Sequence, residues 1–514
     1  MGKSGLCEFL GVLTHPLIFK TRKLMKYILF NENLVLKPDE GRTLILASLV
    51  GRNLLIGQDD SFTDIIHPIY AMILCFVDGR EINECVNEAA SYLSVPKELV
   101  LNFINSLVDN PKQVILSGKK GNSVFPPYTI VSMQSPSQIK RYSPNLFKYD
   151  QIDLRMKRHL TPSTITLMFN NICVTNCIYC YQDKSHVAKC TIPLERIKEL
   201  IREAYKLNVN TFDVIGGEFF LYKYWRDVLA ELRRYGYNPY LSTKMPLQEN
   251  DVQFLAKLKV RDIQISLDSC IEEHLIESIN VRKGYVAEML KSLMLLEKYG
   301  ILVKVHSVLT KYTKDIADMR SIYNVLKNLK NIEDWHVVKG EETLYPRTDY
   351  SNIEIDSLSY NNIVNYLKDL SDSSGMSIHY PKLEQIQIVN NTIDKLKQAE
   401  SHFFNRAFCS GLFSSLYILP DGQVTMCEQL YWNKRFIIGN VKSNSILEIW
   451  NSKEAKSLYE IKQEDFPEDS LCHSCGKFKE CRTFRQVCYR DIIRKYGSQK
   501  WYYPDVKCPY NNQK

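Results

Sequence analysis

The middle of the chain, from residue 165 to residue 338, alternates short apolar segments with amphipathic segments of helical periodicity. Strands that alternate with helices of about 10 to 15 residues predict βαβ units and a parallel sheet. The segments expected as strands are Ile165–Phe169, Phe212–Ile215, Pro239–Ser242, Ile263–Leu267, Val303–Leu309 and Trp335–Val338. Six such units predict an α/β fold with a partial (β/α)6 barrel, whose functional side chains gather at the carboxyl ends of the strands.

The rest of the chain divides by composition into further segments. Residues 1–120 predict a small winged-helix-like α+β domain, in which strand patterns precede helical patterns at Ile65–Val77, Ile82–Leu93 and Pro96–Asp109. Residues 121–160 are rich in Pro, Ser and Gly and predict a linker. We expect the barrel domain over residues 161–400 and a cysteine-rich domain over 401–514.

Charge and hydropathy argue against two classes of partner. The net charge is +8, but residues 1–120 contain 13 Lys and Arg against 13 Asp and Glu, so the winged-helix-like domain carries no excess. That balance argues against nucleic-acid binding. No apolar run reaches the roughly 18 residues that span a bilayer, and no signal peptide is evident. We therefore expect a cytoplasmic protein with neither a nucleic acid nor a membrane as partner.

The fifteen cysteines are clustered rather than spread evenly. Three lie between Cys173 and Cys180 and seven between Cys409 and Cys508. In a long chain without an export signal, clustered cysteines are more often metal ligands or catalytic groups than disulfides.

The first cysteine group has the spacing C-x3-C-x2-C, formed by Cys173, Cys177 and Cys180, directly after the first predicted strand. Three thiolates hold three corners of a [4Fe–4S] cube and leave the fourth iron open for a substrate. The alternative is a zinc site, but zinc usually takes four ligands, and the next cysteine, Cys190, lies ten residues further on.

With this motif the sequence resembles the radical SAM superfamily, and in particular its SPASM-domain branch, over residues 160 to 514. The resemblance implies that the open iron chelates S-adenosylmethionine (SAM). An electron from the cluster then cleaves SAM to a 5′-deoxyadenosyl radical, which removes hydrogen from a substrate carbon. Tyr179, the aromatic residue before the third cysteine, is expected near the adenine.

Other SAM contacts follow from the same resemblance. The second strand runs into Gly216-Gly217-Glu218, similar to the family's GGE motif, whose carboxylate binds the SAM amino group. The fourth strand ends in Ser266-Leu267-Asp268, which resembles a segment directed at the SAM carboxylate and ribose, and Ser242 matches a weaker polar position.

The C-terminal cysteines resemble the seven-cysteine SPASM pattern, which carries two auxiliary [4Fe–4S] clusters. The resemblance assigns Cys472, Cys475, Cys481 and Cys508 to the outer cluster and Cys409, Cys427 and Cys488 to the inner one. Six residues separate Cys481 from Cys488, where the family usually has three. The inner cluster also has only three cysteine ligands, so its fourth iron is either open or bound by another residue. A zinc ribbon is the alternative for this group.

SPASM enzymes commonly modify peptides, and the N-terminal domain resembles the peptide-recognition domains of ribosomal-peptide maturases. The resemblance implies a precursor peptide of leader and core as substrate and an electron donor such as a flavodoxin or ferredoxin. We expect thioether crosslinking, because an open inner cluster is suited to a substrate thiolate. Carbon–carbon crosslinking, formylglycine formation in a sulfatase and a non-catalytic iron–sulfur scaffold are the alternatives.

Overall fold

The computed structural model describes residues 27–47, 63–346, 348–383, 392–406, 408–485 and 487–511. The chain forms two compact units, the first ending at Ser163 and including Asn208–Asn210, the second holding the rest from Thr164 onward. Parts of the expected N-terminal domain, residues 1–26 and 48–62, lie outside the described residues. No helix of the described chain is long and apolar enough to cross a bilayer.

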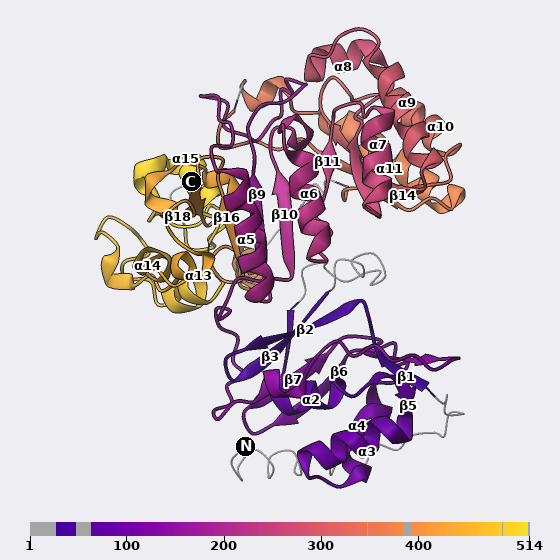
Figure 1. Ribbon diagram of the computed structural model, residues 1–514. Coiled ribbons are helices and arrows are strands. Elements are labelled where there is room, and N and C mark those ends of the chain that lie inside the picture. Colours follow the sequence, from indigo (N-terminus) through magenta and orange to yellow (C-terminus); the bar gives the residue numbers. More distant parts are fainter. Residues whose placement is uncertain are drawn as a thin grey trace. The chain divides into compact units, whose positions relative to one another are not determined.

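Among its described residues, the first unit combines three small sheets with three α-helices (Figure 1). The sheets have the strand orders β5-β1-β8, β2-β3-β4 and β6-β7. The strands are β1 (Tyr27–Phe30), β2 (Leu34–Asp39), β3 (Arg42–Ala47), β4 (Thr63–Ile66), β5 (Asp78–Glu81), β6 (Val114–Gly118), β7 (Gly121–Phe125) and β8 (Ile130–Met133). The helices are α2 (Pro68–Leu74), α3 (Ile82–Leu93) and α4 (Lys97–Leu107), whose apolar faces bury the core around Phe103.

Two predictions for this unit were wrong in detail. The helix expected over Ile65–Val77 begins only at Pro68, because a residue before proline disfavours helical backbone and the His67 side chain caps the first turn. The linker expected over residues 121–160 contains β7 and β8 and a 3₁₀ turn, Pro144–Phe147. Strand β8 pairs with β1, and Phe125 and Phe147 are fully buried, so these residues are part of the unit's core. The Pro, Ser and Gly content of these residues predicted a linker, and the strands that they form are only four or five residues long.

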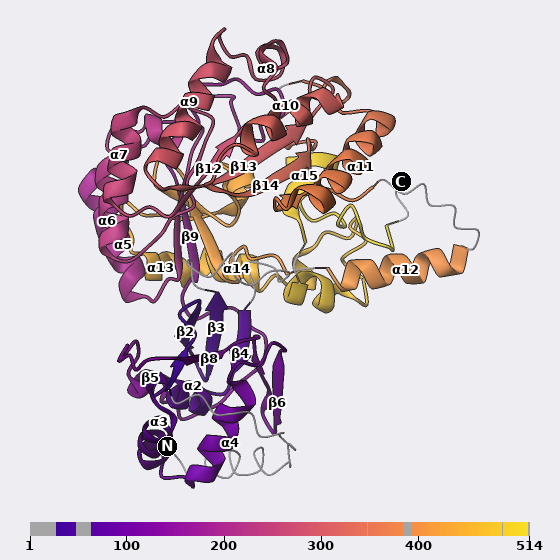
Figure 2. The same ribbon diagram turned by 90° about the vertical axis from the view of Figure 1, so that its right-hand side faces the viewer.

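The second unit contains the predicted alternation of strands and helices. Its strands are β9 (Thr164–Met168), β10 (Thr211–Ile215), β11 (Ser242–Thr243), β12 (Asp262–Ser266), β13 (Leu302–Leu309), β14 (Ile332–Lys339) and β15 (Ile378–His379). The intervening helices are α5 (Leu194–Lys206), α6 (Trp225–Arg234), α7 (Glu249–Lys257), α8 (Glu272–Ile279), α9 (Tyr285–Lys298), α10 (Ile316–Leu326) and α11 (Ser357–Ser374). Figure 2 shows helices of this set forming an outer layer around the strands.

The strands pair in parallel in two sheets rather than in one continuous ladder. Strands β11 to β15 pair in sequence order, while β10 and β9 form the start of a second sheet, β10-β9-β16-β17-β18. The third predicted strand, Pro239–Ser242, is reduced to Ser242–Thr243. Proline has no N–H for a ladder, which is consistent with the strand starting after Pro239.

The cysteine-rich segment continues the same unit. Strand β16 (Ser415–Ile418) pairs in parallel with β9, and β17 (Gln423–Thr425) and β18 (Ile437–Asn440) extend the sheet in antiparallel order. The helices of this part are α12 (Thr392–Phe404), α13 (Ile446–Trp450), α14 (Lys453–Tyr459) and α15 (Tyr489–Tyr496). Cys409 and Cys427 therefore flank strands of the sheet that contains β9, the first strand of the barrel.

Candidate active site

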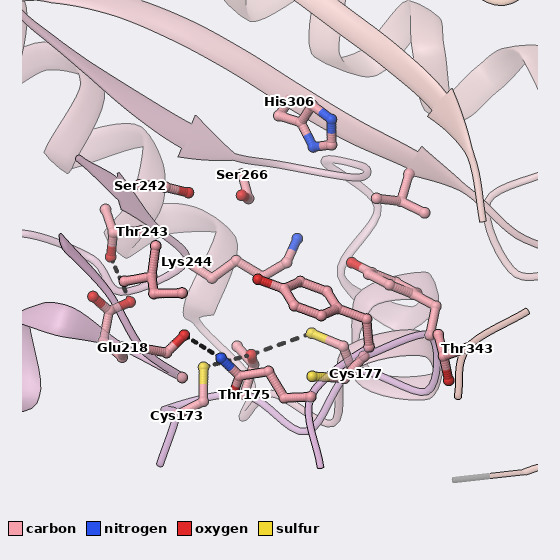
Figure 3. Close-up of a pocket in the computed structure, with 18 of the residues that line it drawn as sticks. Cys173, Thr175, Cys177, Glu218, Ser242, Thr243, Lys244, Ser266, His306 and Thr343 are labelled. Carbon is pink, nitrogen blue, oxygen red and sulfur yellow. Dashed lines mark hydrogen bonds between the residues drawn. The ribbon is translucent and has the colours of Figure 1, made fainter. Parts of the chain in front are cut away.

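A cavity of about 580 Å³ lies at the carboxyl ends of the barrel strands (Figure 3). All but one of the residues expected around the first cluster and SAM line it: Cys173, Cys177, Cys180, Tyr179, Gly216, Gly217, Glu218, Ser242 and Ser266. The exception is Asp268, which is 1% exposed and lies behind the wall. Parallel strands deliver their C-terminal loops to one edge, which explains why positions far apart in sequence meet here.

The cysteine loop is held in place by its own side chains and by α8. The hydroxyl of Thr175 lies 3.3 Å from the sulfur of Cys173 and 3.3 Å from the sulfur of Cys177. The backbone N–H groups of Asn176 and Ile178 donate to carbonyls at the C-terminal end of α8. Burial raises the pKa of Cys177 to about 11, so this sulfur stays a thiol unless a cation binds it.

The two glycines are required by close backbone packing. A Cβ atom at Gly217 would lie 2.2 Å from the carbonyl oxygen of Ile172, the residue before the first cysteine. The N–H of Gly217 donates to the carbonyl of Asn170 at 2.7 Å, and a Cβ at Gly216 would lie 3.2 Å from the same oxygen. The second strand is therefore docked against the entry of the cysteine loop.

Glu218 is buried at the cavity wall, with 2% of its surface exposed. The Thr243 hydroxyl donates to its Oε2 at 2.7 Å, and the N–H of Phe220 donates to its Oε1 at 3.2 Å. Burial raises the pKa of Glu218 to about 7, although these hydrogen bonds oppose the rise. A cation in the cavity would stabilise the ionised carboxylate.

Asp268 is engaged by other side chains of the site instead of facing the cavity. Lys244 Nζ lies 3.0 Å from Asp268 Oδ2, and the Tyr179 hydroxyl donates to the same carboxylate. The N–H of Val308 donates to the other oxygen at 3.0 Å. Asp268 therefore holds Lys244 and Tyr179 in position, whereas the sequence predicted direct contact with SAM.

The two serines are linked by a side chain that the sequence analysis missed. Gln264 Nε2 donates to Ser242 Oγ at 2.9 Å and to Ser266 Oγ at 3.2 Å, and Gln264 itself lines the cavity. Gln264 lies two residues before Ser266 on the same strand, so strand alternation puts both on one face. The two-residue period of a strand was therefore the signal in the sequence that could have identified Gln264.

Other lining residues were missed for different reasons. His306 lies on β13 and lines the cavity, although the sequence favoured a packed or solvated histidine. Lys244 follows Ser242 by two residues, and Glu341, Glu342 and Thr343 follow β14, where the sequence showed no motif. Burial and the charge of Lys244 lower the pKa of His306.

Two sets of C-terminal thiols lie close enough to influence one another's pKa. Burial raises the pKa of Cys508 to about 11, and the nearby thiols of Cys472, Cys475 and Cys481 raise it further. Burial likewise raises the pKa of Cys427 to about 12, with added contributions from two other thiols. Those two are Cys409 and Cys488. A π-helix over Lys479–Arg485 occupies the part of the chain between Cys481 and Cys488 where the spacing exceeds the usual one.

The contacts of the buried Arg482 side chain bear on which group the outer cysteines bind. It is 2% exposed, and its Nη2 lies 3.3 Å from the sulfur of Cys472. Two other nitrogens of this buried guanidinium, Nε and Nη1, have no hydrogen-bond partner among the described residues. A bound anionic thiolate cluster offers acceptors to such donors, so the residues fit that group.

In neither C-terminal cysteine group do the sulfur atoms lie as close together as the ligands of a single metal ion do. Four thiolates on zinc at about 2.3 Å lie roughly 3.8 Å apart. Across the described residues, just one group of three or more His, Cys, Asp and Glu has all its ligand atoms within 4.8 Å, and it contains no cysteine. Wider spacing suits a cube whose irons stand at separate corners.

Comparisons with known proteins agree with this geometry. Residues 167–326 match the radical SAM superfamily, and residues 409–476 match SPASM, an iron–sulfur cluster-binding domain. The chain is 24% identical over 350 residues to the antilisterial bacteriocin subtilosin biosynthesis protein AlbA of Bacillus subtilis, covering 67% of this chain and 70% of AlbA.

Solved structures share the fold. Streptococcus suis SuiB bound to S-adenosylmethionine aligns with a TM-score of 0.61 at 14% identity, over 93% of this chain and 99% of SuiB. SuiB bound to its precursor peptide SuiA gives a TM-score of 0.61 at 15% identity, over 94% and 99%. The radical SAM and SPASM domains imply [4Fe–4S] clusters and SAM as cofactors. The chain thus joins a radical SAM domain to a SPASM iron–sulfur cluster-binding domain, and it is a radical SAM enzyme.

Proposed function

We propose that the protein is a peptide maturase that installs a crosslink in a ribosomally made precursor peptide. One observation carries the proposal: a single cavity brings the three-cysteine loop together with Glu218 and the serines of neighbouring strands. The similarity to AlbA, a bacteriocin biosynthesis protein, and to SuiB, which has been solved with a precursor peptide, supports a peptide as substrate.

In this proposal Cys173, Cys177 and Cys180 hold the SAM-binding cluster. The cluster supplies one electron that breaks a carbon–sulfur bond of SAM and gives a 5′-deoxyadenosyl radical. The carboxylate of Glu218 binds the SAM amino group, and this positive charge offsets the cost of ionising a buried carboxyl. Ser242 and Ser266, fixed by Gln264, contact the polar groups of SAM.

Lys244 has a place in the same arrangement. It lines the cavity with its side chain 12% exposed, and it is held by Asp268 from behind. Burial opposes its charge, but Asp268 together with the nearby sulfurs of Cys177 and Cys173 outweighs burial and raises the pKa of Lys244. A fixed cation at the wall is suited to the SAM carboxylate. Asp268, which was expected to contact SAM, acts through Lys244 and Tyr179.

The seven C-terminal cysteines hold two auxiliary clusters in this proposal, with Cys472, Cys475, Cys481 and Cys508 on the outer one. The inner cluster, on Cys409, Cys427 and Cys488, has no fourth cysteine. We infer a thioether as the product, because a cluster held there by three cysteines would leave one iron as a site for a substrate thiolate. Gln429 and Arg490 line the cavity and follow Cys427 and Cys488 by two residues, which supports a position of this group near the cavity.

The N-terminal unit is proposed to bind the leader of the precursor. Its sheet β2-β3-β4 ends in β2 on one side, and an extended peptide can add to such an edge through main-chain hydrogen bonds. The balanced charge of residues 1–120 fits a peptide better than a nucleic acid. We further propose a flavodoxin or ferredoxin as electron donor and a cytoplasmic location away from membranes, since reducing conditions preserve the thiolates.

The test is anaerobic reconstitution with iron counting, followed by dithionite, SAM and the precursor peptide. About twelve irons per chain, 5′-deoxyadenosine and a peptide lighter by two hydrogens support a crosslinking maturase with three clusters. Fragmentation then distinguishes a thioether from a carbon–carbon bond. About four irons per chain would overturn the auxiliary clusters, and zinc without 5′-deoxyadenosine would overturn the enzymatic proposal.

A further inference from the structure

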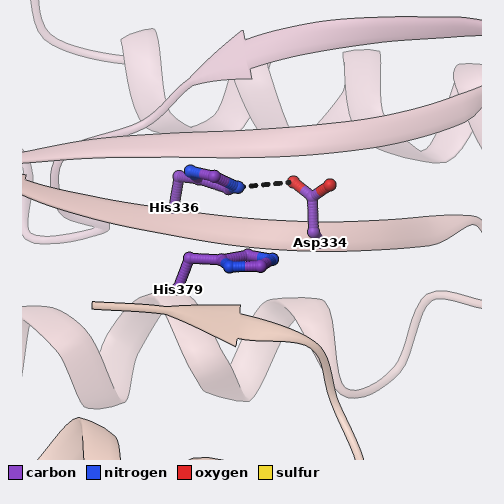
Figure 4. Close-up of side chains that lie close together, drawn as sticks. All are labelled: Asp334, His336 and His379. Atoms are coloured by element: carbon purple, nitrogen blue, oxygen red, sulfur yellow. Dashed lines mark ion pairs between the residues drawn. The ribbon is translucent and has the colours of Figure 1, made fainter. Parts of the chain in front are cut away.

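A second group of ligand-type side chains lies on the inner face of the barrel and contains no cysteine. It consists of Asp334 and His336 on β14 and His379 on β15 (Figure 4). The two strands pair in parallel, with His336 opposite His379. Because side chains alternate along a strand, Asp334 and His336 share one face of β14, while the buried Trp335 between them points to the other.

The three side chains converge. His336 Nε2 lies 3.8 Å from Asp334 Oδ1, and the rings of His336 and His379 lie 4.1 Å apart between centroids. One ligand atom from each residue lies within 4.8 Å of the other two, a closeness that no other set of His, Cys, Asp and Glu reaches in the described chain. The His336 side chain is 47% exposed, so an ion has access from solvent.

An independent observation points to a missing ligand. Asp334 Oδ1 is a buried oxygen without a hydrogen-bond partner in the described part of the structure, and the Asp334 side chain is 13% exposed. A buried carboxylate oxygen without a donor is costly. The oxygen faces His336, and a cation between them removes that cost.

We propose that Asp334, His336 and His379 bind one divalent transition-metal ion, with zinc as the best fit. Two imidazoles and a carboxylate form the set that zinc takes in open sites, where water completes the shell, and other nitrogen-preferring divalent ions fit less specifically. The rings are inclined by only 30°, so binding turns them about the Cβ–Cγ bond, a soft torsion, until their lone pairs meet at the ion. Ser377 Oγ lies 3.3 Å from His379 Nε2 and fixes that ring when Nδ1 binds the metal.

The position of the site suggests its role. Strand β15 is the last strand of its sheet and contains only Ile378 and His379, so its ladder with β14 is short. A metal ion bound by residues of both strands holds β15 against β14. His306, opposite His336 in the register, lines the SAM cavity, as does Val338, roughly 7 Å further along β14. The ion therefore stabilises the part of the sheet that forms this side of the cavity wall.

The test uses the anaerobically reconstituted holoenzyme, so that the cysteines are occupied by iron. The protein is equilibrated with zinc, desalted and analysed for zinc and iron. The His336→Ala/His379→Ala double variant and Asp334→Asn are compared with the wild type. His402→Ala, an exposed histidine on α12, is the matched control.

We expect one zinc per chain in the wild type and in the control, and none in the other two variants, with iron unchanged in all four. Unchanged iron shows that the variants fold. Zinc-edge absorption should give nitrogen and oxygen ligands at about 2.0–2.2 Å. Equal zinc in the double variant and the wild type, or a sulfur shell at about 2.3 Å, would overturn the proposal. Zinc should also raise the melting temperature of the wild type and not that of the double variant.

Discussion

Lys244, at the wall of the cavity, forms an ion pair of 3.0 Å with Asp268, whose side chain is fully buried. Their sequence positions are 24 residues apart, at the ends of neighbouring strands β11 and β12. The pair has consequences for stability and for catalysis.

Removal of one partner of the Lys244–Asp268 pair should be more harmful than removal of both. Lys244→Met or Asp268→Asn leaves a buried charge unpaired, which costs about 3–5 kcal/mol of the free energy of unfolding. The double variant should recover part of this loss while SAM cleavage stays low. A double-mutant cycle by urea unfolding, with 5′-deoxyadenosine measured in parallel, checks both. The exposed pair Lys298–Glu249 is the control, and equal coupling in the two pairs would contradict the prediction.

Glu218 should make the SAM-free protein less stable as the pH rises. Its pKa is about 7 in the folded protein against an ordinary value of 4.5, so the folded state binds more protons between these values. Stability attributable to this group therefore falls from pH 4.5 to 7, by about 3 kcal/mol in total. Glu218→Gln should be more stable than the wild type at pH 8, and the difference should vanish near pH 4.5.

Urea unfolding from pH 5 to 8 measures this difference directly. Glu195→Gln, at a 77% exposed side chain, should follow the wild type at every pH. An identical pH slope for Glu218→Gln and the wild type would show that the carboxyl is not perturbed. Glu218→Gln should also weaken SAM binding at pH 8, where the wild-type carboxylate is ionised.

Alanine at Gly217 should disrupt SAM cleavage much more than alanine at Gly216. The added Cβ at Gly217 meets the Ile172 carbonyl at 2.2 Å, a backbone atom that can move only with the cysteine loop. The Cβ at Gly216 has 3.2 Å to the Asn170 carbonyl and needs a small adjustment. A displacement near 1 Å at the reacting centre costs about a hundredfold in rate. Initial rates of 5′-deoxyadenosine formation distinguish the two variants, and similar losses in both would refute the packing argument.

A substitution in one C-terminal cysteine group should remove the cluster of that group and leave the other cluster in place. Cys475→Ala and Cys427→Ala should each lose about four irons per chain, from the outer and the inner cluster respectively. Both should still cleave SAM, because the first cluster is intact, and both should fail to crosslink the peptide. Cys190→Ala, a half-buried cysteine outside both groups, should keep all its iron. Iron analysis and peptide mass spectrometry check this, and loss of one iron or of zinc alone would contradict the cluster assignment.

The sequence alone determined the parts of this protein that depend on short-range pattern. The alternation of apolar and amphipathic segments predicted the barrel because strand and helix periods are local properties. The spacing of Cys173, Cys177 and Cys180 and the Gly216–Glu218 motif predicted the lining of one cavity, because parallel strands end at a common edge.

Tertiary structure decided the rest, where partners are distant in sequence and carry no motif. The short strands β7 and β8 form because β6 offers a partner to β7 and β1 offers one to β8. Asp268 turns from the cavity to Lys244 because a buried carboxylate is stabilised by the nearest cation. His336 and His379 meet because parallel pairing of β14 and β15 sets their register, and no local signal specifies which strands pair.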